Sequence, residues 1–145
     1  MPKLSTYPEV TPQSGDLIAI TRGGKNYNYD YDSLRRKNID VVVVAVAAAP
    51  AINTDDGDIF TITGLSLAIT SLTTNLTGTP AHGEMIMIQI TDNGTSRAIA
   101  HGAKFVSTSD ATMFTATTAN KKLTELFQWD STAAVWECIG ATEQL

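Results

Sequence analysis

The sequence predicts an all-β protein: an antiparallel β-sandwich of the jelly-roll kind, preceded by a short N-terminal β-ribbon. Charged residues make up only 17% of the 145 residues, while Thr, Ala, Ile and Val recur throughout. That composition is typical of half-buried pleated surface. Apolar and polar residues also alternate with a period of two in about eight short segments, with no long amphipathic helix between them. Such a series of short strands is typical of sandwiches and jelly rolls.

The first 40 residues differ in character from the rest of the chain. They hold six of the ten Lys and Arg residues and all four tyrosines. Residues 16–21 predict a strand, residues 22–25 a turn with two glycines, and residues 26–31 a returning strand with its tyrosines on one face. Because a two-stranded ribbon is only marginally stable alone, we expect residues 1–40 to dock onto the rest of the subunit or another protein.

The run VVVVAVAAA, residues 41–49, is apolar without any alternation. It is too short to cross a membrane as a helix, which takes about 20 residues. A strand covered on both faces, by its own subunit or by a neighbouring one, accounts for the pattern. We therefore treat residues 41–54 as an apolar strand and linker before a sandwich domain at 55–145. The predicted subunit contacts are Val41, Val42, Val43, Val44 and Val46.

Two hairpins are predicted in the sandwich, after short strands at 59–63, 65–69 and 72–76. The first is GEMIMIQITDNGTSRAIAHG, residues 83–102. Its Asp-Asn-Gly sequence is a strong signal for a reversing turn, with Asn93 and Gly94 at positive φ. The second pairs residues 122–129 with 134–139 and turns at 130–132.

Charge excludes two classes of partner. The net charge is −5, and no Lys or Arg occurs between Lys37 and Arg97. Because nucleic acids and anionic membrane surfaces are bound by clustered cations, we expect neither partner. The N-terminal residues also lack the apolar region of a secretory signal. The single cysteine, Cys138, excludes an intrachain disulfide and is expected to be a small buried apolar residue.

Catalytic chemistry is hard to assemble from this sequence. The two histidines, His82 and His101, belong to no metal-ligand spacing, and neither has an obvious acid or base partner. The acidic cluster at residues 55–58 lacks the ligand pattern of an EF-hand, which favours a solvated turn. We predict a protein that is not an enzyme and needs no cofactor or metal. Trp129 and Trp136 are expected in the core or at a subunit contact, with a sugar-stacking platform as the alternative.

Two stretches are similar to a β-sandwich module in virion proteins of tailed bacteriophages. They are GEMIMIQITDNGTSRAIAHGAKF and TATTANKKLTELFQWDSTAAVWECIG. The likeness covers residues 55–142 and includes the preceding segment ITGLSLAITSLTTNLTGTPAHG. The module occurs at the ends of head or tail fibres and in capsid-decorating proteins. One departure is His101, where such modules often carry Trp.

The N-terminal stretch SGDLIAITRGGKNYNYDYDSL resembles the segment by which phage fibres attach to the virion, with its GD-L-I start and paired glycines. The resemblance implies a head decoration or head-fibre protein, homotrimeric, made in the host cytoplasm and carried on the particle surface. Its partner would be the major capsid protein or a tail protein. The implied attachment residues are Leu17, Ile18, Ile20, Tyr27, Tyr29 and Tyr31.

Two rival functions remain open at this point. One is a tail fibre or receptor-binding module that binds a host-surface glycan, which predicts exposed Trp or Tyr beside polar loops. The other is a small sandwich enzyme, whose titratable groups would have to converge from distant loops.

Overall fold

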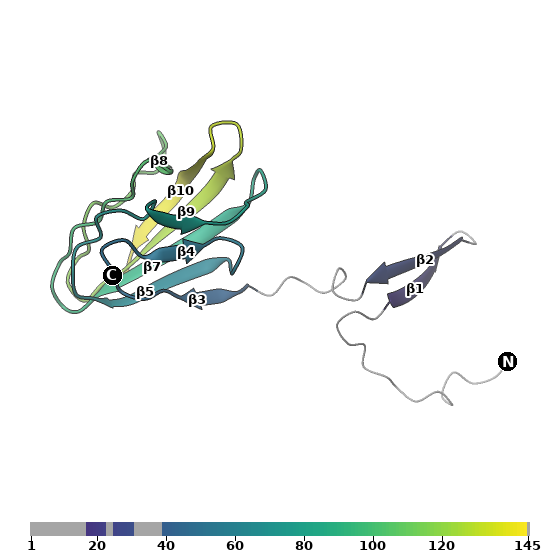
Figure 1. Ribbon diagram of the computed structural model, residues 1–145, viewed down its shortest axis with the longest axis horizontal. Helices are drawn as coiled ribbons and strands as arrows, with labels where there is room; N and C mark the ends of the chain where they lie inside the picture. Colours follow the sequence, from purple (N-terminus) through teal and green to yellow (C-terminus); the bar gives the residue numbers. More distant parts are fainter. Residues whose placement is uncertain (1–16, 23–24, 31–38, 145) are drawn as a thin grey trace, which may run out of the picture. The chain divides into compact units, whose positions relative to one another are not determined.

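The computed structural model describes residues 17–22, 25–30 and 39–144. The chain divides into two compact units, residues 1–38 and residues 39–145. In the first unit, β1 (Leu17–Arg22) pairs antiparallel with β2 (Lys25–Asp30), and Leu17 lies opposite Asp30 (Figure 1). The two strands of the ribbon therefore pair as the sequence predicts. In the turn predicted at 22–25, Arg22 and Lys25 pair as the ends of the two strands, while Gly23, Gly24 and Tyr31 lie outside the described residues.

The second unit is a parallel β-solenoid of about three turns. Along one side, β3 (Val41–Val43), β5 (Ile59–Leu65) and β7 (Met85–Asp92) are parallel neighbours. Along another side, β4 (Ala51–Asn53) is parallel to β6 (Asn75–Thr77). A parallel bridge between Ile69 and Ile99 joins successive turns at a third position. Each turn of the chain thus stacks on the preceding one (Figure 1).

The predicted antiparallel sandwich or jelly roll is therefore wrong, although the chain is all-β as predicted. The physical reason lies in what alternation specifies. A period of two determines which side chains of a strand face the core, but a parallel and an antiparallel neighbour satisfy that pattern equally well.

A C-terminal hairpin extends the main sheet. β9 (Lys122–Asp130) pairs antiparallel with both β7 and β10 (Val135–Glu143). β8 (Phe105–Ser107) adds parallel to β10, which makes a six-stranded sheet in the order β3-β5-β7-β9-β10-β8. This confirms the hairpin predicted at 122–139, and its turn holds Ala134 at φ 55°. A shift of register between Cys138 and Gly140 lets β10 run on to Glu143.

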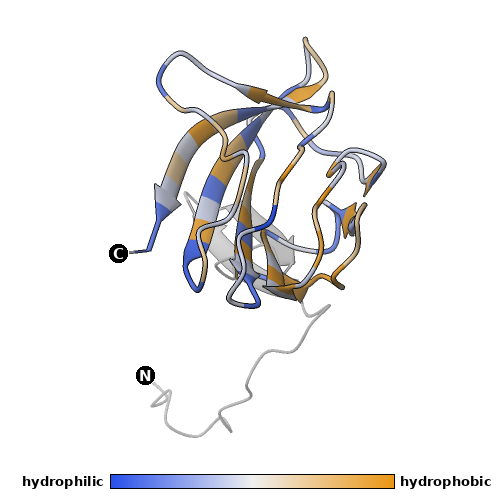
Figure 2. Ribbon diagram, turned by 90° about the vertical axis from the view of Figure 1, so that its left-hand side faces the viewer, coloured by the Kyte–Doolittle hydropathy of each residue, from blue (hydrophilic) through white to orange (hydrophobic). Residues whose placement is uncertain are grey.

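The core is built from ladders of apolar side chains that stack from one turn to the next. The register places an apolar residue of one strand beside an apolar residue of the next. The members of each ladder are buried or packed on the core. The ladders are Val42–Phe60–Ile88, Ile62–Ile90–Leu123, Ile52–Leu76 and Ile69–Ile99. Figure 2 shows apolar and polar residues alternating along the long strands, which directs one set inward. Burying each large aliphatic or aromatic side chain is worth about 1.5–3 kcal/mol.

The predicted hairpin at 83–102 is also wrong. β7 pairs with β5 and β9, and the segment after its turn carries Ile99 to a parallel bridge with Ile69. The Asp-Asn-Gly sequence therefore forms a corner of the solenoid. Gly94 has φ +92°, as predicted, whereas Asn93 does not have positive φ. The Asp92 Oδ1 atom holds the corner by accepting the N–H groups of Gly94 (2.8 Å) and Asn120 (3.0 Å).

The apolar run at 41–49 begins the solenoid, and residues 41–54 belong to its first turn. The backbone carbonyl of Asp40 accepts the N–H groups of Asp58 (2.9 Å) and Ile59 (3.0 Å), which ties the start of β3 to β5. Gly57 lies close to this strand: a Cβ atom at Gly57 would come within 2.7 Å of the Val42 side chain and 3.0 Å of the Asp40 carbonyl oxygen. No helix with the length and hydropathy needed to cross a bilayer occurs among residues 39–144 or in the described ribbon strands.

Candidate functional site

A pocket lies between the β4–β6 sheet and the C-terminal hairpin of the solenoid unit. We call it the tryptophan pocket; its volume is about 200 Å³. Its walls come from four separate parts of the chain, which the winding of the solenoid brings together. They are Thr54, Leu76, Thr77, Gly78, Pro80, Lys104, Trp129 and Trp136.

Trp129 and Trp136 lie side by side because they are opposed residues of β9 and β10. Their ring centroids are 5.2 Å apart and the rings are inclined at 54°. Such a tilted pair is a favourable aromatic contact. Trp136 is 1% exposed and belongs to the core, whereas Trp129 is only partly buried. The pair therefore joins the core to the surface of the pocket.

Several polar groups of the pocket have no partner within the described part of the chain. Neither indole N–H donates a hydrogen bond within the described residues. Neither nitrogen is among the buried unpartnered side-chain atoms there, which are Asp92 Oδ2 and Arg97 Nε, so solvent reaches both indole groups. The hydroxyl of Thr77 likewise makes none, while its backbone carbonyl accepts from Thr54. Thr77 is exposed, so water can satisfy its hydroxyl in the empty pocket. The pocket thus presents hydrogen-bonding groups beside apolar surface.

Lys104 is the one cation among the residues lining the tryptophan pocket. Its Nζ donates to the carbonyl of Ala134 at 2.9 Å, which holds the side chain against the hairpin turn. An ammonium group has three donor hydrogens, so two remain for another acceptor. A carboxylate or hydroxyl at this end of the pocket would meet a positive charge.

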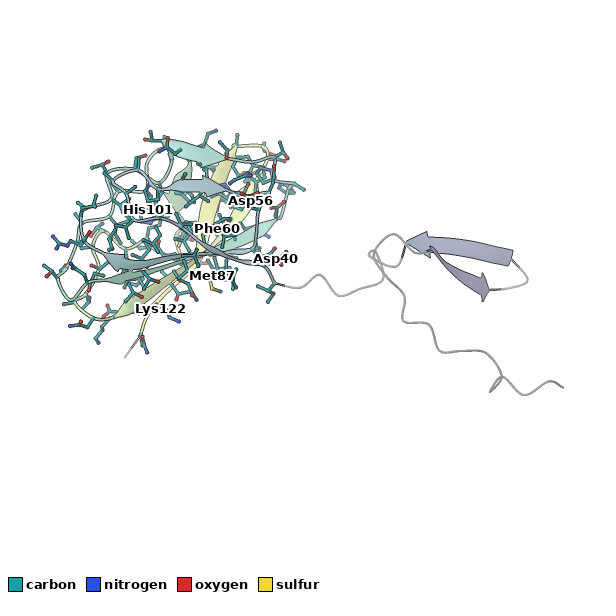
Figure 3. All side chains as sticks on the ribbon, turned by 60° about the horizontal axis from the view of Figure 1, so that its bottom comes forward. Asp40, Asp56, Phe60, Met87, His101 and Lys122 are labelled. Carbon is teal, nitrogen blue, oxygen red and sulfur yellow. The ribbon has the colours of Figure 1, made fainter. Side chains whose placement is uncertain are left out.

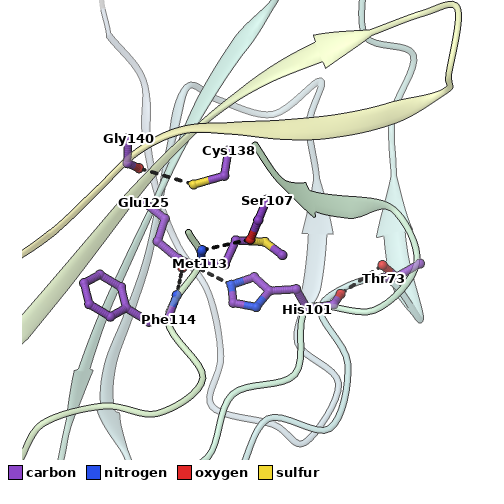
Figure 4. Close-up of polar contacts among 8 residues, drawn as sticks. All are labelled: Thr73, His101, Ser107, Met113, Phe114, Glu125, Cys138 and Gly140. Carbon is purple, nitrogen blue, oxygen red and sulfur yellow. Dashed lines mark hydrogen bonds and ion pairs between the residues drawn. The ribbon is translucent and has the colours of Figure 1, made fainter. Parts of the chain in front are cut away.

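The structure brings His101 and Glu125 together in the core, a pairing that the sequence did not indicate. His101 Nε2 lies 2.7 Å from Glu125 Oε2, and both side chains are buried (Figure 4). Figure 3 labels His101 among the side chains of the solenoid unit. The other carboxylate oxygen accepts the backbone N–H of Phe114 at 2.7 Å. The imidazole also packs near the rings of Phe105 and Phe127. Both side chains are buried and neither lines the tryptophan pocket, so this is the geometry of a buried structural contact.

The other candidate groups are dispersed. His82 is exposed and its Nδ1 accepts from Ser131, at the tip of the last hairpin. In the acidic cluster, Asp55 accepts the N–H of Thr79 (2.8 Å) and Asp56 accepts the amide of Asn53 (2.9 Å). These carboxylates serve separate loop contacts. Across the described ranges, no three His, Cys, Asp or Glu side chains gather as metal ligands.

Cys138 is buried, as the sequence predicts. Burial raises the pKa of its thiol above the usual value, and the negative charge of Glu125 acts in the same direction. A thiol held in its neutral form is a poor nucleophile. Cys138 therefore acts as a small apolar residue of the inner face of β10.

The five valines predicted as subunit contacts fall into two groups. Val44 is buried, and Val42 and Val46 pack partly buried against the same core. Val41 and Val43 instead point outward and are 61% and 80% exposed. The predicted attachment residues Leu17, Ile18, Ile20, Tyr27 and Tyr29 lie on β1 and β2, in the other unit.

Sequence reasoning found the tryptophan pair but missed Thr77, Lys104 and the His101–Glu125 contact. Lys104 lies 27 residues after Thr77 and 32 before Trp136, so no local motif links them. The sequence matches no protein-family model and no curated protein.

Proposed function

We propose that this chain is a non-enzymatic structural protein of a tailed-bacteriophage virion, a head decoration or head-fibre protein anchored by its N-terminal unit. The observation that carries the proposal is an apolar outer face on the six-stranded sheet, uncovered within the described part of the chain. It supports assembly with further copies. The resemblance of both units to virion segments supplies the biological setting.

One row of apolar side chains on the outer face crosses four neighbouring strands. The register places Val41 beside Ile59, Ile59 beside Met87, and Met87 beside Leu126. Each of these residues alternates with a neighbour that faces the core, so all four point outward. Val43 and Met85 flank the row on the same face, beside Thr61 and Gln128, and are exposed. Val41 is exposed, whereas Ile59, Met87 and Leu126 are half-buried. Contiguous apolar surface that solvent reaches is typical of protein contacts.

We propose that further copies of this chain cover the outer face. β3 is the first strand of its sheet and has no strand on its other side within the described residues. An open edge beside exposed valines is prone to pair with another chain. The centre of the face carries no charge, so copies of an acidic protein meet there without repulsion. We propose a homotrimer, as the resemblance implies.

The two units differ in the sign of their net charge. Residues 1–38 hold six Lys or Arg against four Asp or Glu, a net charge of +2. Residues 39–145 hold four against eleven, a net charge of −7. An attachment segment of opposite sign can be drawn to an acidic surface of a capsid or tail protein that would repel the solenoid. The polarity of the molecule therefore favours anchoring through residues 1–38.

Immunogold electron microscopy of purified phage particles tests the proposal directly. An antibody raised against residues 39–145 should label intact particles, on the head if the protein decorates it. Labelling confined to tail tips would favour the alternative, a tail fibre. Particles that lack the protein, by labelling and by mass spectrometry, would contradict a virion role altogether.

A further inference from the structure

We infer that the tryptophan pocket binds a single saccharide residue and prefers one that carries a carboxylate. The inference goes beyond a structural role in the virion and does not depend on it, because sugar binding is measured on the isolated protein. It rests on the chemistry of four side chains: Thr77, Lys104, Trp129 and Trp136.

The size of the pocket limits the ligand. Pockets for drug-sized molecules have volumes of about 300–1,000 Å³, whereas this one has about 200 Å³. A ligand with one six-membered ring fits this volume better than an extended peptide or a nucleotide. The phosphates of a nucleotide would also require more than the one cation that lines the pocket.

The lining combines apolar surface with hydrogen-bonding groups, and a sugar ring is bound by both. Trp129 and Leu76 offer apolar surface to the C–H face of the ring, and Trp129 is accessible enough to do so. The Thr77 hydroxyl and the indole N–H of Trp136 are unpartnered within the described residues. Ring hydroxyls can accept from both. A purely hydrocarbon ligand would cover the Trp136 indole N–H, which solvent now reaches, without accepting a hydrogen bond from it, at a cost of about 1–3 kcal/mol.

Lys104 adds the preference for an acidic sugar. Its ammonium is fixed by Ala134 and keeps two donor hydrogens. The rest of the solenoid unit is acidic, so this cation is a local exception in the field around the pocket. A uronic acid can place its ring over Trp129 and its carboxylate at Lys104.

The chain has two tryptophans, so its proton–nitrogen NMR spectrum has two indole signals. They are assigned with the variant Trp129→Phe. The probes are glucuronic acid and glucose, added to the full-length protein at up to high millimolar concentration. Both indole signals should shift on addition of glucuronic acid, with weaker binding of glucose.

Three variants localise the effect. Lys104→Met should abolish most of the preference for glucuronic acid, about threefold for a single exposed charge contact. Thr77→Val should weaken both sugars, and the control Lys121→Met should change neither, because Lys121 pairs with Glu143 outside the pocket. Indole signals that stay still with both sugars would overturn the inference. So would shifts that survive both Thr77→Val and Lys104→Met, since the sugar would then bind elsewhere.

Discussion

His101 Nε2 lies 2.7 Å from the Oε2 atom of Glu125, inside the core and beside the rings of Phe105 and Phe127. A buried carboxylate is tolerated only where its lone pairs are satisfied. Glu125 meets that condition through His101 and the Phe114 N–H. The contact therefore fixes the loop that holds Phe114 and the segment that ends at His101 against β9.

The first prediction follows from this contact. Glu125→Leu should lower the free energy of unfolding by about 3 kcal/mol or more, because two buried donors lose their acceptor. Glu137→Leu is the matched control, since Glu137 lies on the outer face of β10 and is not buried. It should change stability by less than about 0.5 kcal/mol. Urea denaturation of both variants makes the comparison; equal losses would mean that the contact adds nothing.

Gly94→Val should destabilise the solenoid by about 1–3 kcal/mol, because a β-branched residue is strained at positive φ. Gly94 has φ +92°, and a Cβ there would lie 3.2 Å from the Asn120 side chain. Gly94→Asn should cost less, since Asn tolerates this conformation better. Thermal melts compare the two. A Val variant that melts with the wild type would show that the corner at residues 92–94 relaxes freely.

Asp92 predicts an acid-dependent loss of stability. Its pKa is held below the usual 3.8 chiefly by the backbone N–H of Asn120, then by Thr117, Gly94 and the charge of Arg97. Because the folded pKa is below the unfolded one, its contribution is complete above about pH 4 and is lost as the pH falls through the folded pKa. The stability gap between wild type and Asp92→Asn should narrow below pH 4. A gap independent of pH would contradict this assignment.

The outer face should govern assembly. The wild-type protein should sediment as a trimer at micromolar concentration, and Val43→Asp should shift it towards monomer, because a charge would be buried at the contact. Ser66→Asp adds the same charge at an exposed position away from the face and should leave the trimer intact. A wild type that sediments as a stable monomer would refute the proposed interface.

Deletion of residues 1–38 should leave the solenoid folded and abolish attachment to particles. The cut is placed before Ile39 because Asp40 contributes its carbonyl to Asp58 and Ile59. Circular dichroism checks the fold, and co-sedimentation with particles that lack the protein checks binding. If the truncated chain still decorated those particles fully, attachment would have to be assigned to the solenoid.

The sequence by itself determined the strands that begin at 59 and 85, the inward and outward residues of the long strands, the ribbon strands at 17–22 and 25–30, and the C-terminal hairpin. The strands predicted at 65–69 and 72–76 form only in part, as the end of β5 and as β6. These depend on short-range physics: alternation, turn residues and composition. The last hairpin was predictable because its two strands are neighbours in the chain and pair with each other.

Only the tertiary structure decided which strands become neighbours elsewhere. The ladder through Val42, Phe60 and Ile88 has members 18 and 28 residues apart, so the turns of the solenoid have unequal lengths and leave no fixed period in the sequence. The Asp-Asn-Gly sequence at 92–94 can form the corner of a solenoid as well as the turn of a hairpin, so it does not specify which strands pair. The tryptophan pocket depends on the same winding, because side chains from distant segments meet only once parallel turns have stacked.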